Sequence, residues 1–136
     1  MAGTQIVNCT PHVIRIFSKD DTRYDKYLRK RFLIRKDAKP LVEIPTSGIV
    51  LSVSKRLNKI GEVNGIPICE LVPQLPDNLS NLLKLEEGTL LVVSTLFAIA
   101  CQQAKLEVFK NRLLTVGSPV YLEEKLVGCL CLVNTY

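Results

Sequence analysis

A chain of 136 residues with 47% apolar and 23% charged residues has the size and composition of one ordinary globular domain. No apolar run reaches the roughly 18 residues of a membrane-spanning helix, and the first residues lack the basic and apolar regions of a signal peptide. Five scattered cysteines and a single histidine argue against a disulfide framework and against a zinc site. We therefore expect a cytoplasmic protein with no membrane contact, no metal and no cofactor.

Residues 6–17 predict two short strands separated by a bend at Thr10-Pro11. Pro11 fixes its own φ and holds Thr10 in an extended conformation, which interrupts the strand. His12, the chain's only histidine, follows at once. Two interpretations stay open. Thr10 and His12 face a ligand, or they only satisfy backbone groups where the ladder is broken.

Residues 19–39 form a basic segment, which we expect to be a flap or insertion: a short helix, a hairpin or a disordered flap. Its nine basic and four acidic residues give a net charge of +5, equal to that of the whole chain. The segment is a solvated flap, a nucleic-acid contact with Tyr24, Tyr27 and Phe32 available for stacking, or a clamp over a small anion. The expected basic patch consists of Arg23, Arg29, Lys30, Arg31 and Arg35.

The middle of the chain predicts strands and turns. Residues 41–44 read as a strand that ends at the turn 45–48, and residues 49–54 read as a further strand. Asn64-Gly65 lies between two apolar stretches and predicts a two-residue hairpin turn. Residues 72–88 are expected to be mostly loop, with one helical turn over residues 79–85.

The last third begins with an apolar run at residues 89–93, which predicts a buried strand. Ser94-Thr95 then predicts a helix start before residues 96–104. A helix start is a plain cap in most proteins, and it is also a natural anion site. Further short strands are expected at residues 106–109, 113–116, 120–122 and 126–133.

These elements predict one domain over residues 1–136, of the α+β class. Its sheet is expected to be mostly antiparallel or a partly closed barrel, with one clear helix after a buried strand. An apolar, strand-rich surface on so small a chain also predicts a homo-oligomer.

The opening Val7-Asn8-Cys9-Thr10-Pro11-His12 resembles the Asn-Leu-Thr-Pro-His opening of a family of small bacterial and bacteriophage proteins. Similar segments follow in the family's order over nearly the whole chain: Pro45-Thr46-Ser47-Gly48, Ile49 to Ser54, Gly65-Ile66-Pro67, Val93 to Ala98, Pro119-Val120 and Val127-Gly128. Cys9 stands where leucine is usual, and the basic segment is longer than the family's short hairpin. The resemblance implies a part in host–virus conflict, in which the protein sequesters a nucleotide immune signal in the host cytosol.

We therefore expect a binding protein rather than an enzyme, with a small phosphate-bearing nucleotide as its ligand. The residues expected to bind the ligand are Thr10, His12, Arg15, Ser47, Gly48, Ser94 and Thr95. One alternative is a nucleic-acid-binding or virion-associated accessory protein that acts through residues 19–39. A second alternative is a phosphodiesterase with His12 as general acid or base.

Overall fold

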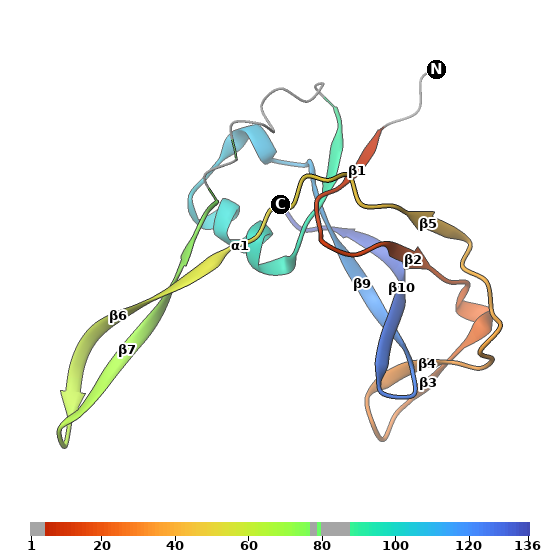
Figure 1. Ribbon diagram of the computed structural model, residues 1–136, viewed down its shortest axis with the longest axis horizontal. Coiled ribbons are helices and arrows are strands. Elements are labelled where there is room, and N and C mark those ends of the chain that lie inside the picture. Colours follow the sequence, from red (N-terminus) through yellow and green to blue (C-terminus); the bar gives the residue numbers. More distant parts are fainter. Residues whose placement is uncertain (1–4, 77–78, 80–87) are drawn as a thin grey trace.

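The structure of the protein is a computed structural model that describes residues 5–76, 79 and 88–136. Strands make up 48% of the described residues, which contain one α-helix (Figure 1). The predicted α+β class, with a partly closed barrel-like sheet, is confirmed. The helical turn expected over residues 79–85 lies, except for Leu79, outside the described residues. Within the described ranges, no helix is long and apolar enough to cross a bilayer.

One eight-stranded sheet forms the body of the protein. Six strands follow one another in the order β1 (Ile6–Asn8), β8 (Leu90–Val92), β9 (Leu113–Leu122), β10 (Lys125–Asn134), β2 (Ile14–Ile16) and β5 (Val42–Ile44). The hairpin of β3 (Thr22–Asp25) and β4 (Lys30–Leu33) adds to the sheet through a parallel pairing of β4 with β9. The long β9–β10 ladder is antiparallel, whereas the pairings of β8 with β1 and β9 and of β2 with β10 are short and parallel.

The sheet nearly closes on itself around β1. On one side the N–H of Cys9 donates to the carbonyl of Val92, 2.9 Å away, which extends the β1–β8 pairing. On the other side the N–H of Ser47 donates to the carbonyl of Asn8, and the N–H of Leu51 donates to the carbonyl of Cys9. Because residues 47–51 continue directly from β5, the last strand of the sheet returns to the first.

The strand–helix junction predicted near residue 94 is confirmed. Strand β8 is buried, and α1 (Thr95–Gln103) follows it with Ser94 as the N-cap. The Ser94 hydroxyl oxygen accepts from the N–H of Phe97 at 3.2 Å. The helix places Phe97, Ala98 and Cys101 in the main core cluster. This cluster closes one end of the barrel-like sheet beside β8 and β9.

Two predictions about the last third are wrong. Residues 106–109 are not a strand, because Lys105 takes a positive φ of 55° and the chain forms the 3-10 helix η3 (Glu107–Phe109), which buries Phe109. Residues 113–116 and 120–122 are not separate strands but parts of β9. The Gly117-Ser118-Pro119 stretch makes no turn, because β10 continues to pair with it on both sides of Ser118.

The strand predicted over residues 49–54 is also wrong, except for Ser54. Leu51 is buried in the core, and Ile49 and Val53 pack against the same cluster, so this segment runs inward beside β1. The ladder begins only with β6 (Ser54–Val63), which pairs antiparallel with β7 (Ile66–Gln74). The predicted hairpin turn is confirmed, since Asn64 and Gly65 have φ values of 53° and 79°, as a type I′ turn requires.

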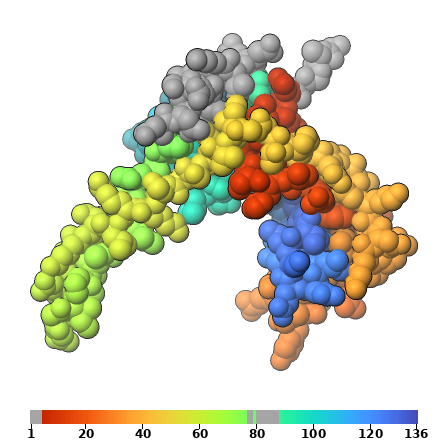
Figure 2. All heavy atoms as spheres, in the orientation of Figure 1, coloured from red at the N-terminus to blue at the C-terminus, as the bar shows by residue number. Residues whose placement is uncertain are grey.

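The β6–β7 hairpin projects from the body as a separate two-stranded sheet. In the space-filling view it stands clear of the remaining described residues over most of its length (Figure 2). Of its strand residues only Val72 is half-buried, and all the others are exposed.

Gly128 lies where β10 passes β2 most closely. A Cβ atom at this position would lie 2.5 Å from the Arg15 carbonyl oxygen and 2.5 Å from Cε2 of Phe17. We expect Gly128→Ala to lower the free energy of unfolding by about 2–3 kcal/mol, because backbone and a buried ring must shift. Gly61→Ala is the matched control, since no atom lies within 4 Å of its added Cβ. Equal losses in urea denaturation of the two variants would contradict the close approach.

The five cysteines are free thiols that differ in burial: Cys9, Cys101 and Cys129 are buried, and Cys69 and Cys131 are exposed. Burial raises the pKa of Cys9 and of Cys101 from 9.0 to about 11, although a contact with Ser47 lowers the value for Cys9. We expect a thiol reagent at neutral pH to label Cys69 and Cys131 rapidly and the other three only on unfolding. Rapid labelling of all five would contradict this.

The raised pKa values of Cys9 and Cys101 also give a pH dependence of stability. Both values are higher in the folded state than in the unfolded state, so their contribution to stability is complete below pH 9.0. It is lost as the pH rises toward 11, because unfolding then releases protons. We therefore expect the denaturation midpoint in urea to fall over this pH window.

Candidate functional site

Asn8, rather than Thr10 or His12, organises the opening motif. Its side chain is 1% exposed, and Nδ2 donates to the carbonyls of His12 at 2.8 Å and Ile44 at 3.1 Å. Its Oδ1 accepts from the N–H of Thr10 at 2.9 Å and from the Thr10 hydroxyl at 2.6 Å. One buried amide therefore holds the bend after β1 and attaches it to the end of β5.

Ser47 and Gly48 complete this arrangement from the other side. The Ser47 hydroxyl donates to the Asn8 carbonyl at 2.7 Å, and its oxygen accepts from the N–H of Ile49 at 3.2 Å. Gly48 has a φ of 86°, which turns the chain back toward β1. Thr10 and Ser47 therefore lie together around Asn8, and both hydroxyls bond groups of the protein itself.

The other residues expected to bind the ligand are Ser94, Thr95, Arg15 and His12. Because β1 and β8 are parallel neighbours, Ser94 and Thr95 emerge at the same edge of the sheet as Thr10, and the Ser94 hydroxyl caps α1. Arg15 lies on β2, where Nε is 3.8 Å from Oε1 of Glu43. The His12 imidazole is exposed and makes no hydrogen bond or ion pair with any residue of the described ranges.

The basic segment is a hairpin preceded by the 3-10 helix η1 (Lys19–Asp21). At its tip Oδ1 of Asp25 accepts from the N–H groups of Tyr27 and Leu28, which fixes a tight turn. Strand β4 then pairs with the second half of β9, so that Arg31 lies opposite Val120 and Phe32 opposite Tyr121. This pairing brings residues nearly ninety positions apart into contact.

A cavity of about 290 Å³ lies where the basic hairpin meets β9. We call it the basic pocket. Its lining combines three cations, two tyrosine rings, a hydroxyl and a proline: Tyr24, Arg29, Lys30, Arg31, Ser118, Pro119 and Tyr121. Four of the seven lie in the basic segment, and three come from the stretch of β9 around Ser118.

Two of the three cations of the basic pocket are held by aromatic rings and a hydroxyl. Nζ of Lys30 lies 4.8 Å from the centre of the Tyr121 ring, and Cζ of Arg31 lies 5.7 Å from that of Tyr24. Nη1 of Arg31 also donates to the Thr22 hydroxyl at 3.0 Å. These contacts hold both cations in place and leave their charges unneutralised.

Elsewhere in the basic segment two cations have carboxylate partners. Arg35 lies 3.6 Å from Asp21, and Lys36 lies 3.8 Å from Glu123. Within the described ranges, Arg29, Lys30 and Arg31 form no ion pair with a carboxylate. Arg23 and Arg35, also expected in the basic patch, do not line the pocket. Seven cations of the segment form no ion pair in the described part of the chain, and three of them line the pocket; the other four are Lys19, Arg23, Lys26 and Lys39.

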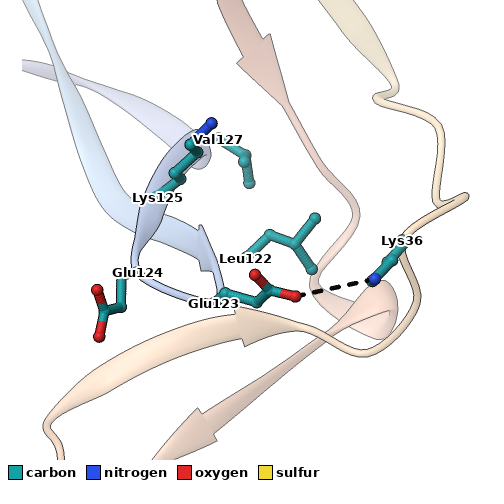
Figure 3. A pocket seen from close by; sticks show the side chains of 6 residues that line it. All are labelled: Lys36, Leu122, Glu123, Glu124, Lys125 and Val127. Carbon is teal, nitrogen blue, oxygen red and sulfur yellow. Dashed lines mark ion pairs between the residues drawn. The ribbon is translucent and has the colours of Figure 1, made fainter.

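A larger cavity of about 620 Å³ lies beside the β9–β10 turn (Figure 3). Its lining includes two lysines and two glutamates, Lys36, Lys125, Glu123 and Glu124, with Leu122 and Val127. The Lys36–Glu123 ion pair spans it, as the dashed line in Figure 3 shows. Because the carboxylates offset the amines, this cavity has no net attraction for an anion, and we favour the smaller basic pocket as the candidate site.

Sequence reasoning identified only half of the basic pocket. Tyr24, Arg29, Lys30 and Arg31 belong to the basic segment, whose charge excess marks them. Ser118, Pro119 and Tyr121 were missed because Gly117-Ser118-Pro119 is a typical turn signal, and nothing local indicates that β4 pairs with β9. The described residues contain no cluster of His, Cys, Asp and Glu that could hold a metal ion.

Comparisons with models of protein families, with curated proteins and with solved structures gave no match to this chain.

Proposed function

We propose that this protein is a non-enzymatic binding protein that sequesters a small, phosphate-bearing nucleotide in the basic pocket. One observation carries the proposal: three cations that have no carboxylate partner among the described residues surround a cavity that also has two tyrosine rings and a serine hydroxyl. A nucleotide has the complementary parts, since its phosphate takes cations and hydroxyls and its base stacks on aromatic rings.

Charge is the first supporting argument. Arg29 and Arg31 offer planar guanidinium donors that fit phosphate oxygens in pairs, and Lys30 adds a point charge. Arg31 is already oriented by Thr22 and Tyr24, so little side-chain entropy is lost when it binds an anion.

Size is the second supporting argument. Cavities that hold small molecules measure about 300–1,000 Å³, and the basic pocket, at about 290 Å³, lies just below that range. A pocket of this size suits a ligand of one or two nucleotide units, with part of it exposed to solvent. The sequestering role in host–virus conflict rests on the resemblance of the opening motif and its companion segments.

Isothermal titration calorimetry against cyclic nucleotides and ADP-ribose derivatives tests the proposal. We expect at least one ligand to bind with micromolar or tighter affinity, and the corresponding nucleoside without phosphate to bind far more weakly. The absence of heat from every ligand of the panel would contradict the proposal.

A second candidate function, nucleic-acid binding, is favoured by the tip of the basic hairpin. Tyr27 is 96% exposed there, beside Lys26 and Leu28, so its ring is available to stack on an unpaired base. This function predicts binding of single-stranded DNA or RNA that weakens steeply with salt and is lost in Tyr27→Ala. If the protein binds a mononucleotide and Tyr27→Ala leaves its affinity unchanged, the tip is excluded as the binding site and the basic pocket is favoured.

A further inference from the structure

The β6–β7 hairpin needs a cover that the described part of its own chain does not supply. Six large apolar side chains on it are 41–68% exposed: Leu57, Ile60, Val63, Ile66, Ile68 and Leu71. A two-stranded hairpin alone in water is marginally stable at best. Because every molecule carries this hairpin, one covering surface is needed for each molecule. A second copy of the chain meets that condition.

The two edges of the hairpin differ in their capacity to accept another strand. A two-residue type I′ turn closes on a hydrogen-bonded pair, here Val63 with Ile66. Hydrogen-bonded and non-hydrogen-bonded pairs then alternate along the ladder, apart from the bulge between Lys59 and Gly61. In the non-hydrogen-bonded pairs the backbone groups of β6 point away from β7, and the β6 residues concerned are Lys55, Leu57, Lys59 and Glu62. All four carry an outward N–H group.

The β7 residues opposite these four also point their backbone groups away from the hairpin, and they are Pro67, Cys69, Leu71 and Pro73. The two prolines have no N–H to donate, and prolines on an exposed edge prevent strand addition. Strand β7 also lies against α1. The edge of β6, which carries no proline, is therefore the one that remains open to a further strand.

Charge selects the strand that fits this edge. Lys55 and Arg56 lie at the start of β6, and Glu62 lies near its end. Glu62 also pairs with Lys59 of its own strand, so a partner's Lys55 would join an existing ion pair. An antiparallel pairing of β6 with β6 of a second copy, centred on Asn58, sets Lys55 of each copy opposite Glu62 of the other. This register is possible because the bulge makes the backbone groups of both residues point outward. A parallel pairing would instead oppose like charges.

We propose that this protein forms a two-fold symmetric dimer by pairing the open β6 edges of two copies into one four-stranded sheet. The pairing supplies each edge with hydrogen bonds and brings the Leu57 and Leu71 side chains of both copies onto one face of that sheet. The dimer does not depend on a ligand, so its test is independent of the basic pocket.

Sedimentation velocity across a range of protein concentrations tests the dimer with two matched variants. Leu57→Pro removes an outward N–H from β6, and Leu71→Pro removes the same side chain and an outward N–H from the directly opposite position on β7. We expect the wild type and Leu71→Pro to sediment as dimers and Leu57→Pro as a monomer. A monomeric wild type, or an equal effect of the two prolines, would overturn the proposal.

A charge exchange provides a test that leaves the backbone of the hairpin intact. Lys55→Glu and Glu62→Lys are each expected to raise the dimer dissociation constant at least tenfold, and the double exchange is expected to restore it. Circular dichroism verifies that each variant is folded. Failure of the double variant to recover the dimer would overturn the antiparallel register.

Discussion

Replacing Asn8 by alanine is expected to lower the free energy of unfolding by about 3 kcal/mol, since each buried polar group left unsatisfied costs about 1–3 kcal/mol. The amide donates to the His12 and Ile44 carbonyls and accepts twice from Thr10, and its side chain is 1% exposed. Alanine would remove all four of these hydrogen bonds where the sheet closes, although the Thr10 hydroxyl still donates to the His12 carbonyl. Urea denaturation monitored by circular dichroism measures the change.

The control for Asn8 is His12→Ala. The His12 imidazole is exposed and only the backbone N–H and carbonyl of this residue take part in the motif, so the variant is expected to stay within about 0.5 kcal/mol of the wild type. A large loss in His12→Ala, or a loss below about 1 kcal/mol in Asn8→Ala, would contradict the account of the bend, because buried hydrogen-bond networks normally cost more to break.

Replacing Arg31 by methionine is expected to weaken nucleotide binding by about 10- to 100-fold, the effect of losing one or two hydrogen bonds to a charged group. Methionine keeps most of the length and apolar contact of the side chain and removes the guanidinium. The expected loss therefore concerns the phosphate more than the fold. Calorimetry with the tightest ligand of the nucleotide panel measures it.

Arg35→Met provides the matched control for Arg31. It removes the same charge from the same basic segment, but Arg35 is paired with Asp21 and does not line the pocket. We expect its affinity to stay within about twofold of the wild type, as for a screened surface charge. Similar losses in both variants would show that overall charge, rather than the basic pocket, determines binding.

Local signals in the sequence predicted several elements of the fold. Pro11 marks the bend between β1 and β2, Asn64-Gly65 marks the β6–β7 turn, and Ser94 marks the start of α1. In each case the conformation depends on residues adjacent in the chain, such as a fixed φ, a positive φ or a capping hydroxyl.

Distant contacts decided the elements that the sequence did not predict. Gly117-Ser118-Pro119 reads as a turn, yet the pairing with β10 keeps it within one strand. Residues 49–53 have the composition of a strand, yet Leu51 enters the core and leaves no ladder. Tertiary packing overrides local preference at both places.

One part of the candidate site could likewise be predicted from local signals, and the other part depends on distant contacts. An excess of charge in residues 19–39 is visible in the sequence and marks Arg29, Lys30 and Arg31. The role of β9 depends on a parallel pairing of two short stretches, Arg31–Phe32 with Val120–Tyr121, which no local pattern indicates. The opening motif, in contrast, stands out in the sequence. In the structure its residues Asn8 and Thr10, together with Ser47 from the turn after β5, form hydrogen bonds that involve backbone groups.

Recovery of intact nucleotide from the protein tests the central claim most directly. The purified protein is incubated with the nucleotide panel, separated from free ligand, denatured by heat, and the released material is identified by mass spectrometry. We predict one nucleotide in near-stoichiometric amount and chemically unchanged from wild type and Arg35→Met, and little from Arg31→Met. Release of cleaved products would identify an enzyme, and release of no nucleotide from the wild type would contradict the proposed function.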